Sequence, residues 1–447
     1  MSTSRFLYYL VVSALRGVAP ALGSGSSKLA RGFRGRRVAH VTLEEWGLER
    51  RDPIRPTVWV HAPSVGEGYQ ARSVIEALKS LRPDVQVVFT HFSPSAVDLA
   101  ATMPVDVSAY LPWDLRPTTG PVLDAIAPDL LVFTKTEVWP VLAEEAARRS
   151  IPVCLIAATV PERSGRLRGP ARSFLRATWS SLASACAVGE ADAVRLRSLG
   201  VPEGRVLVTG DPGIDSAAQR AQAAAAAADF LAPFHAVPRP TLVAGSTWPS
   251  DDEVLLPALR AIAEERPDVR IIIAPHEPTS AHVAALVGRF EAAGRTARTL
   301  TQVEARGAEG VDVVVVDRVG VLAHLYSVAT FAYVGGGFHA SGLHSVLEPA
   351  AVAVPVMFGP DHQNAPAAAG LMECGGGYTV RDAEEVAQRV LMWAATEDDR
   401  VYASARALSY IDAHRGAAER TAHTLFDIMT SRLEWTKQPF PKFPPRS

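Results

Sequence analysis

A single carboxylate stands where it could act as a base on a bound ligand. A short apolar run, Val58–Val60, ends in the turn His61–Ser64, and Glu67 follows directly after Gly66. The segment after Glu67 has apolar residues at helical spacing, namely Val74, Ile75, Leu78 and Leu81. In an open α/β sheet the strand-to-helix turn lies where ligands bind, so we expect Glu67 to face a ligand. A helix N-terminus also favours an acid for electrostatic reasons alone, and this simpler interpretation stays open.

Turns in the second half of the chain supply groups suited to a phosphate or a nucleotide. Three glycines after an apolar run would let the backbone approach a ligand closely: Gly335, Gly336 and Gly337. His344 and Glu348 are four residues apart, so on a helix they would share one face. Two further turns, each after a predicted strand, add Ser246, Thr247, Pro275 and His276. Together these residues predict a nucleotide pocket, although each turn alone could be purely structural.

Polar and aromatic residues also follow two predicted strands in the first half. Glu137 and Trp139 come after one strand, and Arg163 and Ser164 come after the next. Further arginines downstream, at Arg166, Arg168, Arg172 and Arg176, could hold an anionic acceptor. Trp139 could equally be a core residue, and surface arginines are usually only solvated.

Composition limits the classes of protein to which the chain can belong. With 447 residues, 48% hydrophobic and 21% charged, it has room for two ordinary globular domains. The net charge of −2 gives no reason to expect nucleic-acid binding. The three cysteines are far apart and odd in number, which favours a reducing compartment over a disulfide framework.

The first 40 residues differ from the rest of the chain. They hold seven basic side chains, and the first acid of the sequence is Glu44. The run Phe6–Leu15 is apolar but too short to span a bilayer comfortably, so an interfacial anchor on anionic lipid fits it best. A cleaved signal peptide and a helix of a soluble protein stay open as alternatives.

Strand and helix patterns alternate along two series. The predicted strands of the first are 57–61, 85–90, 130–134, 153–157, 186–188 and 206–210, and those of the second are 241–244, 271–274, 313–316, 331–334 and 356–358. This alternation predicts an α/β protein with two Rossmann-like domains facing a central cleft. We expect an anchor segment at 1–40, a first domain at 41–215, a linker at 216–240, a second domain at 241–425 and a tail at 426–447.

Several familiar catalytic motifs are missing from the sequence. It contains no G-x-G-x-x-G, no P-loop, no G-x-S-x-G and no D-x-D string, and no His/Cys cluster has metal-ligand spacing. The sequence therefore gives no reason to expect a dinucleotide, a metal or any other cofactor.

The motifs, taken in order, resemble those of the 3-deoxy-D-manno-octulosonic acid (Kdo) transferases, which are inverting glycosyltransferases of the GT-B fold. In the first half the matching motifs are 61–67 (HAPSVGE), 110–114 (YLPWD), 128–131 (PDLL), 136–140 (TEVWP) and 162–164 (ERS). In the second half they are 245–247 (GST), 274–276 (APH), 333–336 (YVGG), 347–349 (LEP) after His344, and 358–360 (FGP) followed by Asn364. Each motif is short, but their order and spacing are specific.

The resemblance implies transfer of Kdo from CMP-Kdo to a lipid A precursor at the cytoplasmic face of the inner membrane. Glu67 matches the general base of this family, and one carboxylate suffices because CMP leaves as a stable anion. The resemblance places the acceptor at Ser64, Gly66, Glu137, Trp139, Arg163 and Ser164. It places the donor at Ser246, Thr247, Pro275, His276, Gly335, Gly336, Gly337, His344, Glu348 and Asn364, with no metal and no cofactor.

Some positions depart from the family pattern. Ala157 and Thr159 stand where many members have Asn and Arg, and Asp211 and Gly213 stand where a Lys or Arg motif is common. Ser345 replaces the usual Asn. Each lost cation removes a charge-assisted bond worth about 1.5–3 kcal/mol, so the donor or acceptor could differ. The alternatives are a GT-B-like nucleotide-sugar 2-epimerase and a non-catalytic membrane-associated relative.

Overall fold

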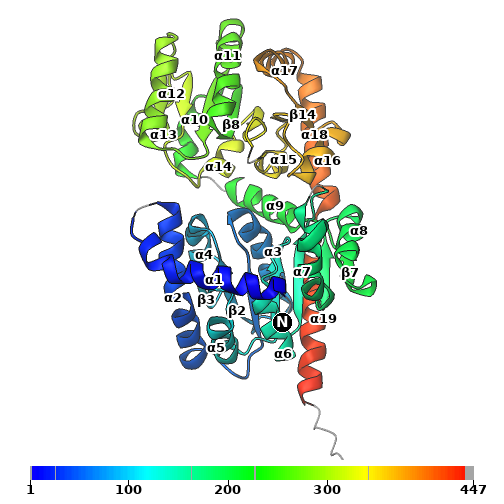
Figure 1. Ribbon diagram of the computed structural model, residues 1–447. Coiled ribbons are helices and arrows are strands. Elements are labelled where there is room, and N and C mark those ends of the chain that lie inside the picture. The colour runs from blue at the N-terminus through cyan, green and yellow to red at the C-terminus, as the bar shows by residue number, and fades with distance from the viewer. Residues whose placement is uncertain (1–2, 26, 163, 226–227, 341, 438–447) are drawn as a thin grey trace, which may run out of the picture. The chain divides into compact units, whose positions relative to one another are not determined.

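The chain folds into two compact units, each built on its own parallel sheet. The computed structural model describes residues 3–25, 27–162, 164–225, 228–340 and 342–437. The first unit comprises Met1–Ser216 with Arg415–Ser447, and the second comprises Ala217–His414 (Figure 1).

The first unit is a seven-stranded sheet with helices on both faces. Its strand order is β3 (Val107–Tyr110), β2 (Gln86–His91), β1 (Thr57–His61), β4 (Leu130–Thr134), β5 (Val153–Ala158), β6 (Ser184–Ala187) and β7 (Val206–Val208). Its helices are α1 (Thr3–Leu22), α2 (Lys28–Glu49), α3 (Val65–Leu81), α4 (Val97–Ala101), α5 (Arg116–Ile126), α6 (Pro140–Arg148), α7 (Gly169–Ser180), α8 (Glu190–Leu199) and α19 (Ala417–Lys437). Short 3₁₀ turns lie at Pro94–Ala96 (η1), Gly165–Leu167 (η2) and Glu203–Arg205 (η3).

Alternation along β1 divides the core of this unit between the two faces of the sheet. Val58 and Val60 lie in a cluster with α3 and α19, whereas Trp59 lies in a second cluster with α2, α5, α6 and α8. Successive strand residues point to opposite faces, and here both faces are covered, so every residue of β1 is buried. At the carboxyl end, His61 lies beside Thr90 of β2 and Phe133 of β4.

The second unit repeats this architecture. Its strand order is β10 (Ala297–Thr299), β11 (Val313–Val315), β9 (Arg270–Pro275), β8 (Thr241–Thr247), β12 (Phe331–Val334), β13 (Val356–Phe358) and β14 (Gly377–Thr379). Its helical elements are η4 (Asp229–Leu231), α10 (Ala232–Ala236), α11 (Pro249–Glu265), α12 (Ser280–Ala292), α13 (Leu300–Arg306), α14 (Leu322–Tyr326), α15 (Leu347–Ala351), α16 (Pro366–Cys374), α17 (Ala383–Ala395) and α18 (Glu397–His414), while α9 (Pro212–Ala225) begins in the first unit and ends in the second.

The predicted strands match the observed ones to within a few residues, and three strands were not predicted. The three are β3, β10 and β14, which hold three or four residues each and lie at sheet edges. Their sequences, VSAY, ART and GYT, are interrupted by polar or small residues and form no apolar run, because these edge strands are only partly buried.

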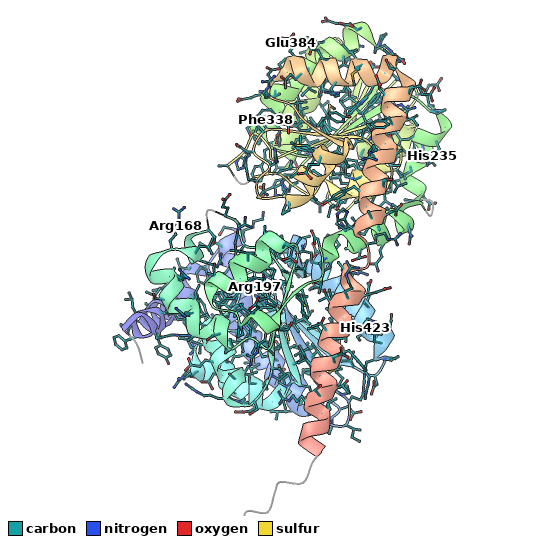
Figure 2. The ribbon with its side chains drawn as sticks, turned by 90° about the vertical axis from the view of Figure 1, so that its right-hand side faces the viewer. Arg168, Arg197, His235, Phe338, Glu384 and His423 are labelled. Carbon is teal, nitrogen blue, oxygen red and sulfur yellow. The ribbon has the colours of Figure 1, made fainter. Side chains whose placement is uncertain are left out.

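Two of the predicted domain boundaries were wrong. Residues 417–425, assigned to the second domain, and most of the expected tail form α19, which packs on the first unit through Ala418, Ala422, Leu425 and Met429. These residues recur at helical spacing, whereas His423, between them on the same helix, is exposed (Figure 2). Residues 217–240 are no free linker either, because Leu231 and Phe234 are buried in the core of the second unit.

The N-terminal segment predicted as an anchor forms two helices on the first unit. One face of α1 places Tyr8, Val12 and Ala19 against Trp113 and Leu115. Its other face exposes an apolar row: Phe6, Leu7, Leu10, Val11, Leu15, Val18 and Leu22. By length and composition Arg5–Leu22 could also cross a membrane, and only 11% of it is buried.

Because α19 completes the core of the first unit, we predict that Leu425→Ala lowers its free energy of unfolding by about 2–5 kcal/mol, as for other buried leucines. Leu425 is 1% exposed. The matched control is Leu48→Ala in the same unit, where the leucine is 76% exposed and the change should stay within about 0.5 kcal/mol. Urea unfolding of the full chain measures both, and equal stability of the two variants would contradict this packing.

Candidate active site

Glu67 lies in the first turn of α3, at the carboxyl edge of the first sheet, as predicted. The hydroxyl of Ser64, the residue before the helix, donates to Glu67 Oε2. The ammonium of Lys135 lies 3.0 Å from Glu67 Oε1, and the side chain of Glu67 is 14% exposed. A carboxylate offers about four lone-pair sites, so these two contacts leave Glu67 room to accept further hydrogen bonds.

Lys135 is a site residue that the sequence analysis missed. It directly follows β4, and its φ of 54° is uncommon for a residue with a side chain. Its N–H donates to the carbonyl of Ile156 on the next strand, which holds the strained backbone in place. Such strain persists where the surrounding structure fixes it, often at functional sites. A lysine immediately after an apolar strand, at the same sheet edge as Glu67, was the available signal.

His61 is a buried neutral imidazole that supports the predicted acceptor residue Trp139. The indole N–H of Trp139 donates to His61 Nε2 at 3.2 Å, and His61 Nδ1 lies 3.0 Å from the carbonyl of Thr90. An indole can only donate, so the ring proton of His61 is on Nδ1 and goes to Thr90. Burial lowers the pKa of His61 from 6.5 to about 3, which keeps it uncharged at neutral pH.

A buried cation holds the other side of Trp139. The guanidinium of Arg36 lies 4.8 Å from the ring centre of Phe92, 4.4 Å from that of Trp113 and 5.4 Å from that of Trp139. The guanidinium donates to the carbonyl of Leu111 and to the carbonyl of Pro112, and burial lowers the pKa of Arg36 to about 10. The α2 helix thereby fixes an aromatic cluster beside the site, which no local sequence pattern indicated.

Asp114 joins the N-terminal helix to this cluster. Its buried carboxylate accepts the N–H groups of Val141 and Leu142 at the start of α6, and the hydroxyl of Tyr8 at 2.7 Å. Burial raises the pKa of Asp114, and the three donors act in the opposite direction. Since α6 begins directly after Trp139, Asp114 links α1 to the start of the helix next to this aromatic residue.

The remaining predicted acceptor residues lie on the same unit. Glu137 pairs with Arg166 at 3.5 Å, and the Ser164 hydroxyl accepts from the N–H of Arg166. Gly66 lies in the first turn of α3, where a Cβ would meet no other atom within 4 Å. Arg163 lies outside the described residues.

In the second unit, aromatic rings gather at the carboxyl edge of the sheet. The ring of Trp248 stacks with that of His276 at 4.6 Å and with that of His339 at 4.2 Å, and His276 stacks with His344 at 4.5 Å. The indole N–H of Trp248 donates to His344 Nε2 at 2.9 Å. Burial, together with His276 and His339, lowers the pKa of His344 to about 4. His276 and His344 were predicted site residues, whereas Trp248 and His339 were not.

A buried carboxylate that the sequence analysis also missed supports this edge. Asp251, in the first turn of α11, accepts from the hydroxyl of Tyr333 and from the N–H groups of Trp248 and Gly336, each at 2.8 Å. It is fully buried. Asp251 therefore ties the start of α11 to the glycine turn after β12.

The three glycines pack backbone against backbone. A Cβ on Gly335 would lie 2.3 Å from the carbonyl oxygen of Ser246, and one on Gly337 would lie 2.5 Å from the nitrogen of Gly359. The N–H of Gly335 donates to the carbonyl of Gly245, and that of Gly336 donates to Asp251, so both donors are used within the protein.

Two other donor residues act on the backbone of the same region. The side-chain amide of Asn364 both accepts from the N–H of Leu343 and donates to its carbonyl, which fixes the residue before His344. Ser246, like Lys135 in the first unit, has a left-handed backbone at a strand end, with φ 55°. Thr247 is buried, and Pro275 is the last residue of β9.

His344 and Glu348 do not share a helix face, so that prediction was wrong. The helix α15 begins at Leu347, and His344 lies before it in an irregular segment. The backbone N–H of His344 donates to the carbonyl of Gly335. Glu348 instead pairs with Arg220 at 3.2 Å. Tertiary bonds at Gly335 and Asn364 override the local helical spacing.

The residues of the first unit that depart from the family pattern have structural partners. Asp211 accepts from Gln70 of α3 at 2.7 Å and from the N–H of Gly213 at 2.8 Å, so it fixes the start of α9. The hydroxyl of Thr159 donates to the carbonyl of Ala157. In the second unit, Ser345 is exposed.

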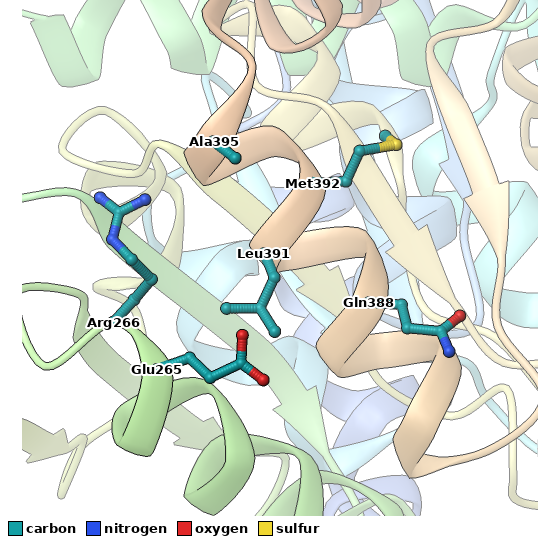
Figure 3. A pocket seen from close by; sticks show the side chains of 6 residues that line it. All are labelled: Glu265, Arg266, Gln388, Leu391, Met392 and Ala395. Carbon is teal, nitrogen blue, oxygen red and sulfur yellow. The ribbon is translucent and has the colours of Figure 1, made fainter.

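A shallow hollow of about 540 Å³ lies elsewhere on the second unit, between the end of α11 and α17 (Figure 3). The residues that line it are Glu265, Arg266, Gln388, Leu391, Met392 and Ala395. Since Glu265 is the last residue of α11, the hollow is at the end opposite to Trp248 and separate from the predicted donor residues. Within the described ranges, no group of three His, Cys, Asp or Glu could hold a metal.

Comparison with known proteins gives matches to one family of enzymes. A family model described as 3-deoxy-D-manno-octulosonic-acid transferase matches residues 35–216. A 3-deoxy-D-manno-octulosonic acid transferase from Bordetella pertussis is 28% identical to this chain, and the match covers 93% of this chain and 97% of the relative. A protein of the same name from Chlamydophila psittaci is 30% identical, and the match covers 69% of this chain and 70% of the relative.

Solved structures show the fold. A putative UDP-N-acetylglucosamine 2-epimerase from Listeria monocytogenes has a TM-score of 0.60 at 14% identity, covering 87% of this chain and 100% of its own. A glycosyltransferase from Rickettsia africae has a TM-score of 0.56 at 11% identity, covering 85% and 99%. This chain has two seven-stranded parallel sheets, and together with these likenesses they confirm the predicted α/β fold of the GT-B type.

The neutral buried histidines predict how stability depends on pH. The pKa of His61 falls to about 3 and that of His344 to about 4 on folding, so the unfolded chain binds more protons below pH 6.5. Stability is therefore full above about pH 6.5 and decreases as the pH falls from there toward 4, by about 1.4 kcal/mol per pH unit for each histidine. Urea unfolding at a series of pH values between about 6.5 and 4 measures this dependence. For His61→Gln, the plot of unfolding free energy against pH should have a slope shallower by about that amount, and an unchanged slope would contradict a neutral buried His61.

Proposed function

Because this chain belongs to the 3-deoxy-D-manno-octulosonic acid transferase family, we propose that it transfers Kdo from CMP-Kdo to a lipid A precursor, with inversion and without a metal ion. The observation that carries the proposal is the placement of Glu67. Its carboxylate lies at the start of a rigid helix, at the ligand-binding edge of a parallel sheet, with Ser64 and Lys135 holding its two oxygens.

The proposed reaction needs one base. Glu67 accepts the proton of an acceptor hydroxyl while the oxygen attacks the anomeric carbon of Kdo. The bond to CMP breaks, and its electrons leave on a phosphate that is already stable as an anion, so no general acid is required. Attack from the face opposite to CMP gives inversion. Lys135 supplies a positive charge beside Glu67 that could also meet an anionic group of a substrate.

We assign acceptor binding to the first unit. Trp139 is fixed by His61 and Arg36 and offers a rigid aromatic surface on the same unit as the base. The acceptor groups are Ser64, Gly66, Glu137, Trp139, Arg163 and Ser164. Rigid support from buried neighbours suits a site that must orient a hydroxyl toward one carboxylate.

We assign CMP-Kdo to the carboxyl edge of the second sheet. The donor groups are Ser246, Thr247, Pro275, His276, Gly335, Gly336, Gly337, His344, Glu348 and Asn364. His276 and His344 are the groups best suited to phosphate, whereas Gly335, Gly336 and Asn364 shape the backbone around them.

We place the protein at the inner membrane, on its cytoplasmic side, and the exposed face of α1 supports contact with a membrane surface. One face of α1 is bonded to the first unit through Tyr8, and the other exposes only apolar side chains and Arg16 among its large residues. The α2 helix adds exposed basic residues at Lys28, Arg31, Arg34 and Arg37. A docked helix of this kind suits the plane of the interface, where apolar insertion and attraction to anionic lipid add together.

Glu67→Gln tests the base. The amide cannot accept the proton, so we expect kcat for transfer from CMP-Kdo to a tetra-acyl disaccharide bisphosphate to fall by about 10²–10⁴-fold. CMP should bind as before, because the change leaves the second unit intact. Product mass spectrometry and calorimetry measure the two quantities.

Glu76→Gln, on the same helix and paired with Arg72, is the matched control and should keep full activity. Full activity of Glu67→Gln would reject its role. Turnover of a soluble UDP-sugar alone by the full chain, without any lipid acceptor, would favour an epimerase. Failure to turn over any CMP-sugar would favour a non-catalytic relative.

A triple variant, with Leu7, Leu10 and Val11 each replaced by serine, tests whether the exposed face of α1 binds a membrane. These side chains are 61%, 48% and 50% exposed, so their loss should not unfold the unit. Binding to vesicles with anionic lipid should fall by about 10-fold or more, because apolar area that would enter the bilayer is removed. Val401→Ser, at a 49% exposed position of α18, should bind vesicles like the unchanged protein. Equal binding by the triple variant would contradict the assignment of this face.

A further inference from the structure

The indole of Trp248 determines which ring nitrogen of His344 carries the proton. Trp248 Nε1 lies 2.9 Å from His344 Nε2, and an indole N–H can only donate. His344 Nε2 must therefore be the unprotonated, accepting nitrogen. In a neutral imidazole the proton is then on Nδ1.

His344 Nδ1 is open to a ligand. Among the described residues, the bonds of His344 are those of Nε2 to Trp248 and of its backbone N–H to Gly335. The His344 side chain is partly exposed, and Nδ1 is not among the buried polar atoms that lack a partner. The Nδ1–H group is thus a donor with no acceptor inside the described part of the second unit.

Both rings are held firmly, which gives the bond between them a fixed geometry. The planes of Trp248 and His344 are 12° apart, and His276 stacks on both rings. The backbone N–H of Trp248 bonds to Asp251, which also holds Gly336, and the N–H of His344 bonds to the adjacent Gly335. Burial beside two other imidazoles keeps His344 uncharged at neutral pH, so its tautomer matters.

We propose that Trp248 is a positioning residue that holds His344 in the Nδ1–H tautomer, so that Nδ1–H donates to a phosphate oxygen of the bound cytidine monophosphate group. The identity of the ligand rests on the function proposed above, whereas the tautomer rests on the geometry of the two rings. A hydrogen bond to a charged oxygen is worth about ten- to a hundredfold in affinity.

Nuclear magnetic resonance of the full chain with ¹⁵N-labelled histidine reads the tautomer directly, without any ligand. We expect His344, assigned by its loss in His344→Ala, to show a protonated Nδ1 and an unprotonated Nε2. Trp248→Phe keeps an aromatic ring but removes the donor, so the Nε2–H form should become populated. An unchanged tautomer in Trp248→Phe would overturn the proposal.

Calorimetric titration with CMP tests the consequence for binding. Trp248→Phe should weaken the Kd by about tenfold, and His344→Ala should weaken it by about ten- to a hundredfold. The double variant should bind no worse than His344→Ala alone, because Trp248 acts only through His344. A further loss in the double variant would overturn this relation.

Trp393→Phe is the matched control for both measurements. Trp393 is buried on α17 in the same unit and stacks on Phe331, at the start of β12 and away from the glycine turn. It should change neither the tautomer nor the Kd, and thermal unfolding checks that each variant is folded. If the unchanged protein shows the Nδ1–H tautomer but does not bind CMP, the donor assignment is wrong, while the effect of Trp248 on His344 stands.

Discussion

Parallel pairing of every strand is the constraint on which the rest of this structure depends. All the pairings in both sheets are parallel, so the carboxyl ends of the strands meet at one edge of each sheet. This brings Glu67 after β1 next to Lys135 after β4, and Trp248 after β8 next to His344 after β12. The same pairing forces residues at these ends into tight turns, where Lys135 and Ser246 adopt left-handed backbones.

Buried charges hold these edges, and each is surrounded by partners. Asp114 accepts three hydrogen bonds, Asp251 also accepts three, and Arg36 lies among aromatic rings. A buried carboxylate is costly unless it is bonded in this way, and removing a single partner leaves the charge uncompensated. Their contribution is therefore to orientation more than to net stability, since both acids fix a helix start beside a proposed substrate residue.

The strands could be predicted because apolar runs of three to six residues between turn residues leave few alternatives. Glu67 and His276 could also be placed, since a turn after a strand identifies the ligand edge without knowledge of the partner. Lys135 and Trp248 could not be assigned roles, because their partners are 68 and 96 residues away in the chain. The spacing of His344 and Glu348 misled for the same reason, as distant bonds decided where α15 begins.

The path of the chain determines the order in which the protein can be completed during synthesis. The second unit is one continuous stretch, Ala217–His414, inserted between the two pieces of the first. A ribosome therefore releases the whole second unit before α19 emerges to cover Val74, Ile75 and Leu78 of α3. Until then the helix that carries Glu67 has an uncovered apolar face, so the proposed base is fully supported only when nearly the entire chain has been made.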